Sequence, residues 1–182
     1  MQRASQARPP PTESMDTHAG ARLDVVTTSA GLVVFREREG ALQVLLGHMG
    51  GPYWARKDAG AWSIPKGELG DGEEPLAGAR REYREELGHE APDGPVVELG
   101  EIRQRGGKRV VAFAVEGSFD PAQLRPGTFE LEWPPRSGRR QAFPEVDRVA
   151  WFDLASAREK LVQGQIALLD RLAEARSAPN SR

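Results

Sequence analysis

An acidic stretch that fits one short helix places the tightest limit on how this chain folds. From Gly67 to Glu90 there are eight acidic and three basic residues, a net charge of −5 in a chain whose total is −2. Pro75 suits the first turn of a helix and Gly88 suits its C-terminal end. We therefore predict a helix from Pro75 to Leu87.

Three carboxylates share one face of this helix. With Glu82 at zero on a helical wheel and roughly 100° per residue, Glu85 falls at about −60° and Glu86 at about +40°. The neighbouring face is an apolar stripe made of Leu76, Ala79, Tyr83 and Leu87. The helix can therefore bury one side and present an acidic cluster along its edge.

Such a cluster fits a divalent cation. Like charges at these spacings repel by roughly 0.2–0.5 kcal/mol per pair, which a bound cation converts into coordination. Oxygen ligands suit Mg²⁺ or Mn²⁺, and phosphate oxygens can complete the shell. Since an isolated run of this kind is more often a solvated acidic face, the surrounding residues must decide.

Those surrounding residues match a known motif. The pattern G-x5-E-x7-R-E-U-x-E-E-x-G-U, with U apolar, describes the positions of Gly67, Glu73, Arg81, Glu82, Glu85, Glu86 and Gly88. This is the Nudix box, and the chain resembles the Nudix hydrolase family from Thr27 to Leu161. His89 departs from the last apolar position, which is expected to loosen only the packing after the helix.

The resemblance implies an α/β fold, the Nudix α/β/α sandwich with a mixed β-sheet and a C-terminal helix. It also implies hydrolysis of a nucleoside diphosphate linked to another group, with Mg²⁺ or Mn²⁺ as cofactor. By position, the metal ligands would be the Gly67 carbonyl and the carboxylates of Glu82, Glu85 and Glu86. Glu82 is also open as general base, and Glu73 and Arg81 would form a structural ion pair.

Glu145 is a fourth catalytic candidate beside the three box carboxylates. It lies six residues before Trp151, an offset at which the family often has a Glu close to the metal site. A role as an extra ligand or base and an ordinary position in a surface loop are both open.

The segment before the box, Trp62 to Gly67, has the pattern W-x-x-P-K-G. It resembles the same region in hydrolases of diadenosine polyphosphates and diphosphoinositol phosphates. Lys66 can meet a polyphosphate chain there as a point charge, or it can be an exposed turn lysine.

Recognition of a nucleobase needs an aromatic face. Tyr53, Trp54 and Trp133 lie in loops or near a strand end, so each is a candidate substrate-binding residue. Arg103, on a predicted hairpin, is a candidate contact for phosphates. The insert at 131–140 is a natural substrate-facing flap, although the sequence does not fix its direction.

Other residues have two open interpretations or a structural one. Trp62 and Trp151 are expected in the core, and His48 either touches phosphate or is polar surface. Lys108, on the same predicted hairpin as Arg103, is likewise a candidate contact for phosphates. Gly78 either admits a close approach of the Gly67 loop or of a phosphate to the helix, or is simply tolerated there at about 1 kcal/mol.

The rest of the chain indicates mixed strands around this helix. We predict a disordered tail at 1–22, a single domain at 23–176 and a frayed end at 177–182. The expected strands are 27–36, 42–48, 128–133, 149–152 and a hairpin of 96–105 with 108–116. A helix is expected from 154 to about 175, with a break near Gly164, and the segment 118–144 is otherwise expected to be irregular.

Composition excludes several classes. The chain has no cysteine, which rules out disulfides and thiolate metal sites. It has no run of about 20 apolar residues and no signal-peptide core, so no membrane contact and a cytoplasmic location are expected. The net charge of −2 implies no long nucleic acid as partner, and protein partners are not predicted.

The leading hypothesis is a metal-dependent pyrophosphohydrolase acting on dinucleoside polyphosphates, or on nucleoside triphosphates. The rival from another class is a non-catalytic nucleotide sensor or interaction module with the same fold. The presence of all three box carboxylates argues for retained chemistry.

Overall fold

A mixed sheet organises the computed structural model, which describes residues 27–178. The strand order is β3-β2-β1-β6-β5, with β4 also paired to β1 and β9 to β2. Strands β1 and β6 run parallel, and the other pairs are antiparallel. The strands are β1 Thr28–Arg38, β2 Ala41–Met49, β3 Trp62–Ser63, β4 Lys66–Glu68, β5 Val96–Arg103, β6 Arg109–Glu116 and β9 Val146–Asp153.

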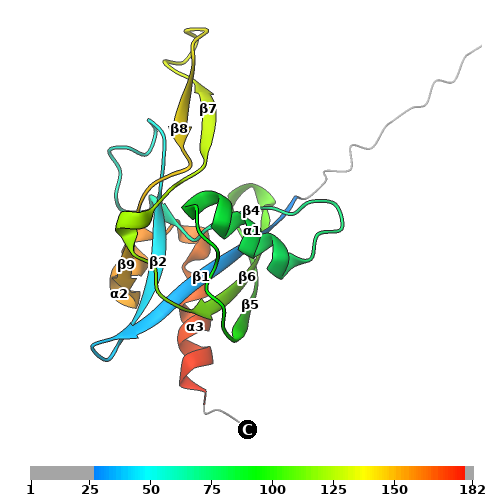
Figure 1. The fold of residues 1–182 in the computed structure, drawn as a ribbon, viewed down its shortest axis with the longest axis vertical. Helices are drawn as coiled ribbons and strands as arrows, with labels where there is room; N and C mark the ends of the chain where they lie inside the picture. The colour runs from blue at the N-terminus through cyan, green and yellow to red at the C-terminus, as the bar shows by residue number, and fades with distance from the viewer. Residues whose placement is uncertain (1–26, 179–182) are drawn as a thin grey trace, which may run out of the picture.

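Helices cover both faces of this sheet because side chains alternate along its strands. Ala30, Leu32 and Val34 of β1 pack on one side against α1, Pro75–Leu87. Val33 and Phe35 face the other side, which α2, Leu154–Lys160, and α3, Ala167–Ser177, cover. Figure 1 shows these layers, and the predicted α/β/α sandwich is confirmed. No helix within 27–178 is long and apolar enough to cross a bilayer.

The central helix has the predicted bounds. Glu74 caps its first turn by accepting a hydrogen bond from the Ala77 N–H, and Gly88 ends it with φ 78°. The Nε2 of His89 lies 2.7 Å from the carbonyl oxygen of Gln123, 34 residues further along the chain. This contact joins the end of the helix to a distant segment.

Most expected strands are present, with shifted ends. The hairpin of β5 and β6 turns through a 3-10 segment, η1 Arg105–Gly107. The predicted break near Gly164 is a second 3-10 segment, η3 Gln163–Gln165.

Helix α3 runs to Ser177, inside the segment expected to fray. The predicted tail at 1–22 and residues 179–182 lie outside the described residues. A third 3-10 segment is η2, Pro121–Gln123.

The segment expected to be largely irregular contains a hairpin of its own. Strands β7, Thr128–Glu132, and β8, Arg140–Pro144, form a separate two-stranded sheet. We call residues 128–144 the arm, which extends away from the main sheet in Figure 1. Only β7 was predicted, because β8 has little apolar alternation to mark it as a strand.

A buried glutamine holds the segment just before the box through hydrogen bonds. Gln165 is 0% exposed; its Oε1 accepts from the Ile64 N–H at 2.9 Å, and its Nε2 donates to Ser63 Oγ at 2.9 Å. These bonds join η3 to the segment that leads into Lys66. The C-terminal region therefore helps to position the box.

We predict that Gln165→Met lowers the free energy of unfolding by about 1–3 kcal/mol, because the buried Ile64 N–H loses its partner. Urea denaturation measures the change. Gln163→Ala, an exposed side chain in the same 3-10 segment, should stay within about 0.5 kcal/mol of the parent. Equal midpoints for Gln165→Met and the parent would contradict the prediction.

Candidate functional site

The loop before α1 lies directly on the acidic face of the helix. A Cβ added to Gly67 would lie 2.0–2.2 Å from the carboxylate atoms of Glu82. Gly67 pairs with Ala30 in the sheet, so its backbone cannot easily withdraw. The contact therefore requires glycine, and it holds the Glu82 carboxylate, 14% exposed, against the Gly67 backbone.

Arg81 joins the acidic residues of this region through its whole guanidinium group. Nε and Nη2 bond the two carboxylate oxygens of Glu73 at 2.8 and 2.9 Å. Nη1 bonds Glu82 at 2.6 Å and Glu85 at 3.2 Å, while Nη2 also donates to the Glu68 carbonyl at 2.9 Å. The bidentate pair with Glu73 has the geometry expected of a structural ion pair.

Glu73 also closes the loop that carries it. Its Oε2 accepts from the Gly70 N–H at 2.9 Å, and the Arg81 guanidinium and this N–H lower the pKa of Glu73 to about 2. Gly78 lies beneath the same loop, since an added Cβ would be 2.3 Å from Leu69 Cδ2 and 3.2 Å from Glu73 Oε2. Of the two interpretations of Gly78, the structure favours close approach of the loop.

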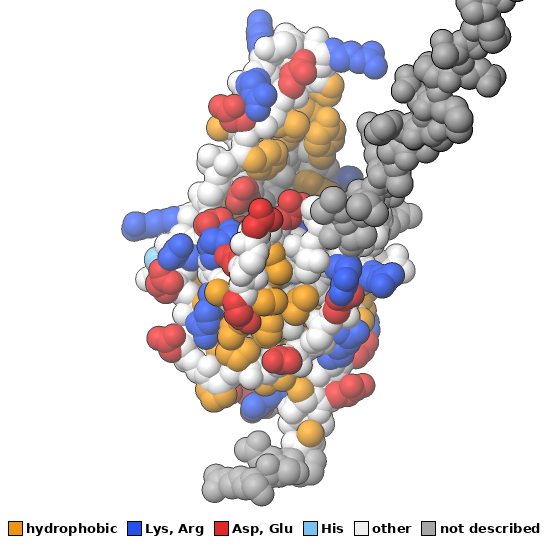
Figure 2. All heavy atoms as spheres, turned by 90° about the vertical axis from the view of Figure 1, so that its right-hand side faces the viewer, with side chains coloured by type: hydrophobic (Ala, Val, Ile, Leu, Met, Phe, Trp, Pro, Cys, Tyr) orange, Lys and Arg blue, Asp and Glu red, His pale blue; other side chains and the backbone are white. Residues whose placement is uncertain are grey.

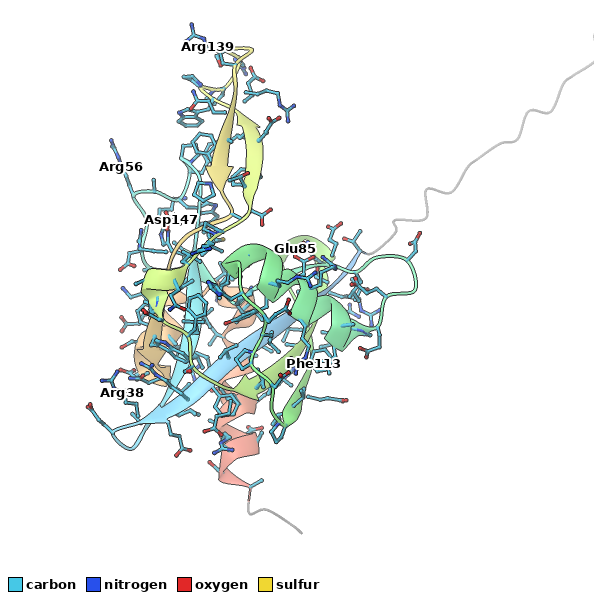
Figure 3. The ribbon with its side chains drawn as sticks, viewed as in Figure 1. Arg38, Arg56, Glu85, Phe113, Arg139 and Asp147 are labelled. Atoms are coloured by element: carbon cyan, nitrogen blue, oxygen red, sulfur yellow. The ribbon has the colours of Figure 1, made fainter. Side chains whose placement is uncertain are left out.

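Glu86 and Glu145 complete the acidic region. Burial raises the pKa of Glu86 to about 8; nearby Lys66 opposes the rise, and Glu145 and Glu82 add to it. Burial, Glu82 and Glu85 also raise the pKa of Glu145. Glu145 therefore lies close enough to feel the box carboxylates, although it follows them by about sixty residues. Figure 3 shows Glu85 on α1, below the arm.

The residues fit a hard divalent cation by their chemistry. Every candidate ligand is an oxygen, and the absence of a side chain at Gly67 lets the Glu82 carboxylate lie directly against the Gly67 backbone. Within residues 27–178 no three acidic or histidine side chains form a finished shell, and Arg81 occupies oxygens of Glu82 and Glu85. Binding therefore requires these arginine contacts to be exchanged for contacts with the cation.

A cavity of about 760 Å³ opens next to the box. Three of the predicted substrate-binding residues line it, Trp54, Lys66 and Arg103. The backbone N–H of Lys66 lies 3.4 Å from Glu86 Oε1, so the cavity begins one residue from the acidic cluster. Its other lining residues are Met49, Gly60, Ser63, Gln104, Val162, Gln163 and Gly164.

Sequence reasoning missed the polar residues of this cavity. Gln104 follows β5, and Gln163 belongs to η3, so only the packing of the C-terminal region on the sheet brings them together. No motif marks them. Gln104 Nε2 and Ser29 Oγ are buried side-chain atoms without a hydrogen-bond partner within 27–178.

The other two predicted substrate-binding residues lie elsewhere. Tyr53 and Trp133 meet edge to face, with ring centroids 5.3 Å apart, where the 50–60 loop touches the arm. Neither lines the cavity. Lys108 bonds Glu68 at 3.2 Å beside the box loop.

His48 is neither a surface residue nor a phosphate contact. It is 0% exposed, with Nδ1 2.8 Å from Asp147 and Nε2 2.7 Å from the Lys57 carbonyl. Both predictions for it were wrong, because the 50–60 loop folds back over β2. Trp62 is in the core as expected, whereas Trp151 is half-buried under the Arg36 guanidinium.

The chain is similar to a known family in its sequence and to solved structures in its fold. The family model described as the NUDIX domain matches residues 26–172, while a search of curated proteins returned no sequence match. The NUDIX domain of Shewanella oneidensis NrtR, complexed with ADP ribose, aligns with a TM-score of 0.56 and 17% identity, over 83% of this chain and 88% of that one.

Two further solved structures are similar. A C. elegans Ap4A hydrolase binary complex aligns with a TM-score of 0.55 and 19% identity, over 82% of this chain and 98% of that one. RenU, a Nudix hydrolase from M. smegmatis, aligns with a TM-score of 0.53 and 23% identity, over 86% of this chain and 91% of that one. At these identities the structures show a shared fold.

Gly67→Ala is predicted to lower turnover at least about a hundredfold, because its Cβ would displace the Glu82 carboxylate by an ångström or more. Steady-state hydrolysis of a nucleotide measures the loss. Gly94→Ala is the matched control, since its Cβ would meet Val115 at an ordinary 3.5 Å. Equal rates for the two variants would refute the role of this contact.

Glu73→Gln should lower the melting temperature in a pH-dependent way. A carboxylate whose pKa is lowered to about 2 stabilises the fold above its unfolded pKa of about 4.3, and this contribution is lost as pH falls toward 2. The gap between parent and variant should thus be widest near neutral pH and narrow below about pH 4. A gap that is constant with pH would contradict this origin.

Proposed function

Because the chain belongs to the Nudix family, and is therefore a hydrolase acting on phosphoanhydrides, we propose that it cleaves a nucleoside polyphosphate with the help of Mg²⁺ or Mn²⁺. A dinucleoside polyphosphate is the favoured substrate, and a nucleoside triphosphate is the alternative. The observation that carries this proposal is the position of the cavity. It places Lys66 and Arg103 beside a cluster of carboxylates on one helix face.

The roles of the chain's own residues follow from their positions. The Gly67 carbonyl and the three box carboxylates would hold the cation, which when bound neutralises phosphate charge and acidifies water. Lys66 and Arg103 bind phosphate oxygens in the cavity. Glu145 or Glu82 accepts the proton of the attacking water at a carboxylate oxygen. Arg81 keeps Glu73, and hence the loop, in place.

Two features support a substrate in which phosphates link a nucleoside to a second group. The cavity of about 760 Å³ lies in the size range of sites for nucleoside-sized groups. Among structures with this fold, one is complexed with ADP ribose and another is named an Ap4A hydrolase. In both names the phosphates link two larger groups.

Product analysis after incubation with a nucleotide panel tests the proposal. ATP, diadenosine tetraphosphate and ADP-ribose are each incubated with Mg²⁺, with Mn²⁺ and with EDTA, and the products are separated by chromatography. We expect metal-dependent cleavage, fastest with diadenosine tetraphosphate. Binding of these compounds without cleavage of any of them would instead identify a sensor.

Glu86→Gln should fold normally and lose at least about a thousandfold in kcat, since charge stabilisation at phosphorus is the main source of acceleration. Glu90→Gln is the matched control: Glu90 is exposed beyond the helix end and pairs with Arg84 at 3.4 Å. Its kcat should stay within about twofold of the parent. Near-parental kcat in Glu86→Gln would overturn the assignment.

A further inference from the structure

The arm depends on a neighbouring loop for its support. Its two strands pair only with each other, from Thr128–Pro144 to Glu132–Arg140, and an isolated two-stranded ribbon is marginally stable in water. The 50–60 loop supplies the missing contacts. A Cβ added to Gly51 would lie 3.0 Å from Phe129 Cζ, and the Gly50 N–H donates to the Glu145 carbonyl at 2.9 Å.

An aromatic pair, exposed Tyr53 and half-buried Trp133, marks the contact between loop and arm. Tyr53 and Trp133 meet at 5.3 Å with their planes 85° apart. Tyr53 is 55% exposed, and within residues 27–178 it is the one large hydrophobic side chain that is exposed. An edge-to-face pair leaves ring faces uncovered, and a planar base can stack on them.

Exposed arginines lie near this pair along the chain, and the arm also carries Glu130 in an ion pair with Arg140 at 3.0 Å. Arg56, Arg136 and Arg139 are exposed, and Figure 3 shows Arg56 and Arg139 extending into solvent from the loop and from the arm. The Trp133 N–H donates to the Arg139 carbonyl at 2.9 Å, so that arginine starts beside the ring. Aromatic faces among guanidinium groups suit a base with its phosphate.

The arm rises from the acidic cluster, and it contacts the same 50–60 loop whose Trp54 lines the cavity. The Gly127 N–H, just before β7, donates to the Glu85 carbonyl at 3.1 Å, and Glu145 follows β8 directly. Lys66 also joins the cluster to the cavity, through Glu86. In Figure 2 the apolar side chains of the arm and the acidic side chains below it lie on the same face.

We propose that the Tyr53–Trp133 pair, with the neighbouring arginines, is a second nucleoside site, which binds the distal nucleoside of a dinucleoside polyphosphate while the first lies in the cavity. This inference rests on the proposed function and names the substrate that the two sites require together. A mononucleotide fills the cavity alone and leaves the arm unused.

Reach limits which substrates can use both sites. Trp133 lies six residues from Gly127 along an extended strand, on the order of 20 Å from the base of the arm at about 3.3 Å per residue. A longer phosphate chain lets the distal nucleoside extend further along the arm. KM should therefore fall from diadenosine triphosphate to tetraphosphate to pentaphosphate, as the longer chains engage the arm.

Steady-state kinetics of Trp133→Ala and Tyr53→Ala test the second site. For diadenosine pentaphosphate each variant should raise KM about tenfold and leave kcat within twofold, as expected for the loss of one stacked base. KM for ATP should not change. Trp133→Phe and Tyr53→Phe keep a ring and should restore most of the lost affinity.

Other outcomes are equally informative. Equal rises in KM for ATP and for the pentaphosphate, or no rise in either, overturn the second site. An effect confined to a 5′-triphosphorylated oligonucleotide also overturns it and assigns the arm to nucleic acid. Wild-type cleavage of ATP with Mg²⁺ reports on the proposed function alone, so failure of the two claims is separable.

Discussion

The contact between the Gly67 backbone and the Glu82 carboxylate is the constraint on which the site depends. A side chain at Gly67 would overlap that carboxylate at 2.0 Å, and the sheet fixes the glycine opposite Ala30. The loop and helix α1 therefore hold one position relative to each other. That position brings Lys66, and with it the cavity, next to Glu86.

Repulsion among the carboxylates of helix α1 is the second constraint on the site. Crowded carboxylates on one helix face repel one another, and in the described residues Arg81 supplies the compensating charge through Glu73, Glu82 and Glu85. The bidentate pair with Glu73 can persist while the single contacts to the other two are exchanged for a cation. The same arginine can therefore fasten the loop and leave the ligands free to bind.

The helix and its box could be predicted from the sequence because their signals are local. Pro75, Gly88 and the spacing of the carboxylates act within one or two helical turns. The cavity could not be predicted, since Gln104 and Gln163 meet only through packing of distant elements. His48 was misassigned for the same reason: its partner Asp147 lies on a strand about a hundred residues away.

The metal position is tested most directly by anomalous scattering from Mn²⁺ in crystals grown with a non-hydrolysable dinucleotide. A peak within about 2.0–2.6 Å of the Gly67 carbonyl and of carboxylate oxygens from Glu82 and Glu86 is the expected result. Bound dinucleotide with no manganese peak at these oxygens, or with manganese elsewhere on the chain, would contradict a catalytic centre on this helix.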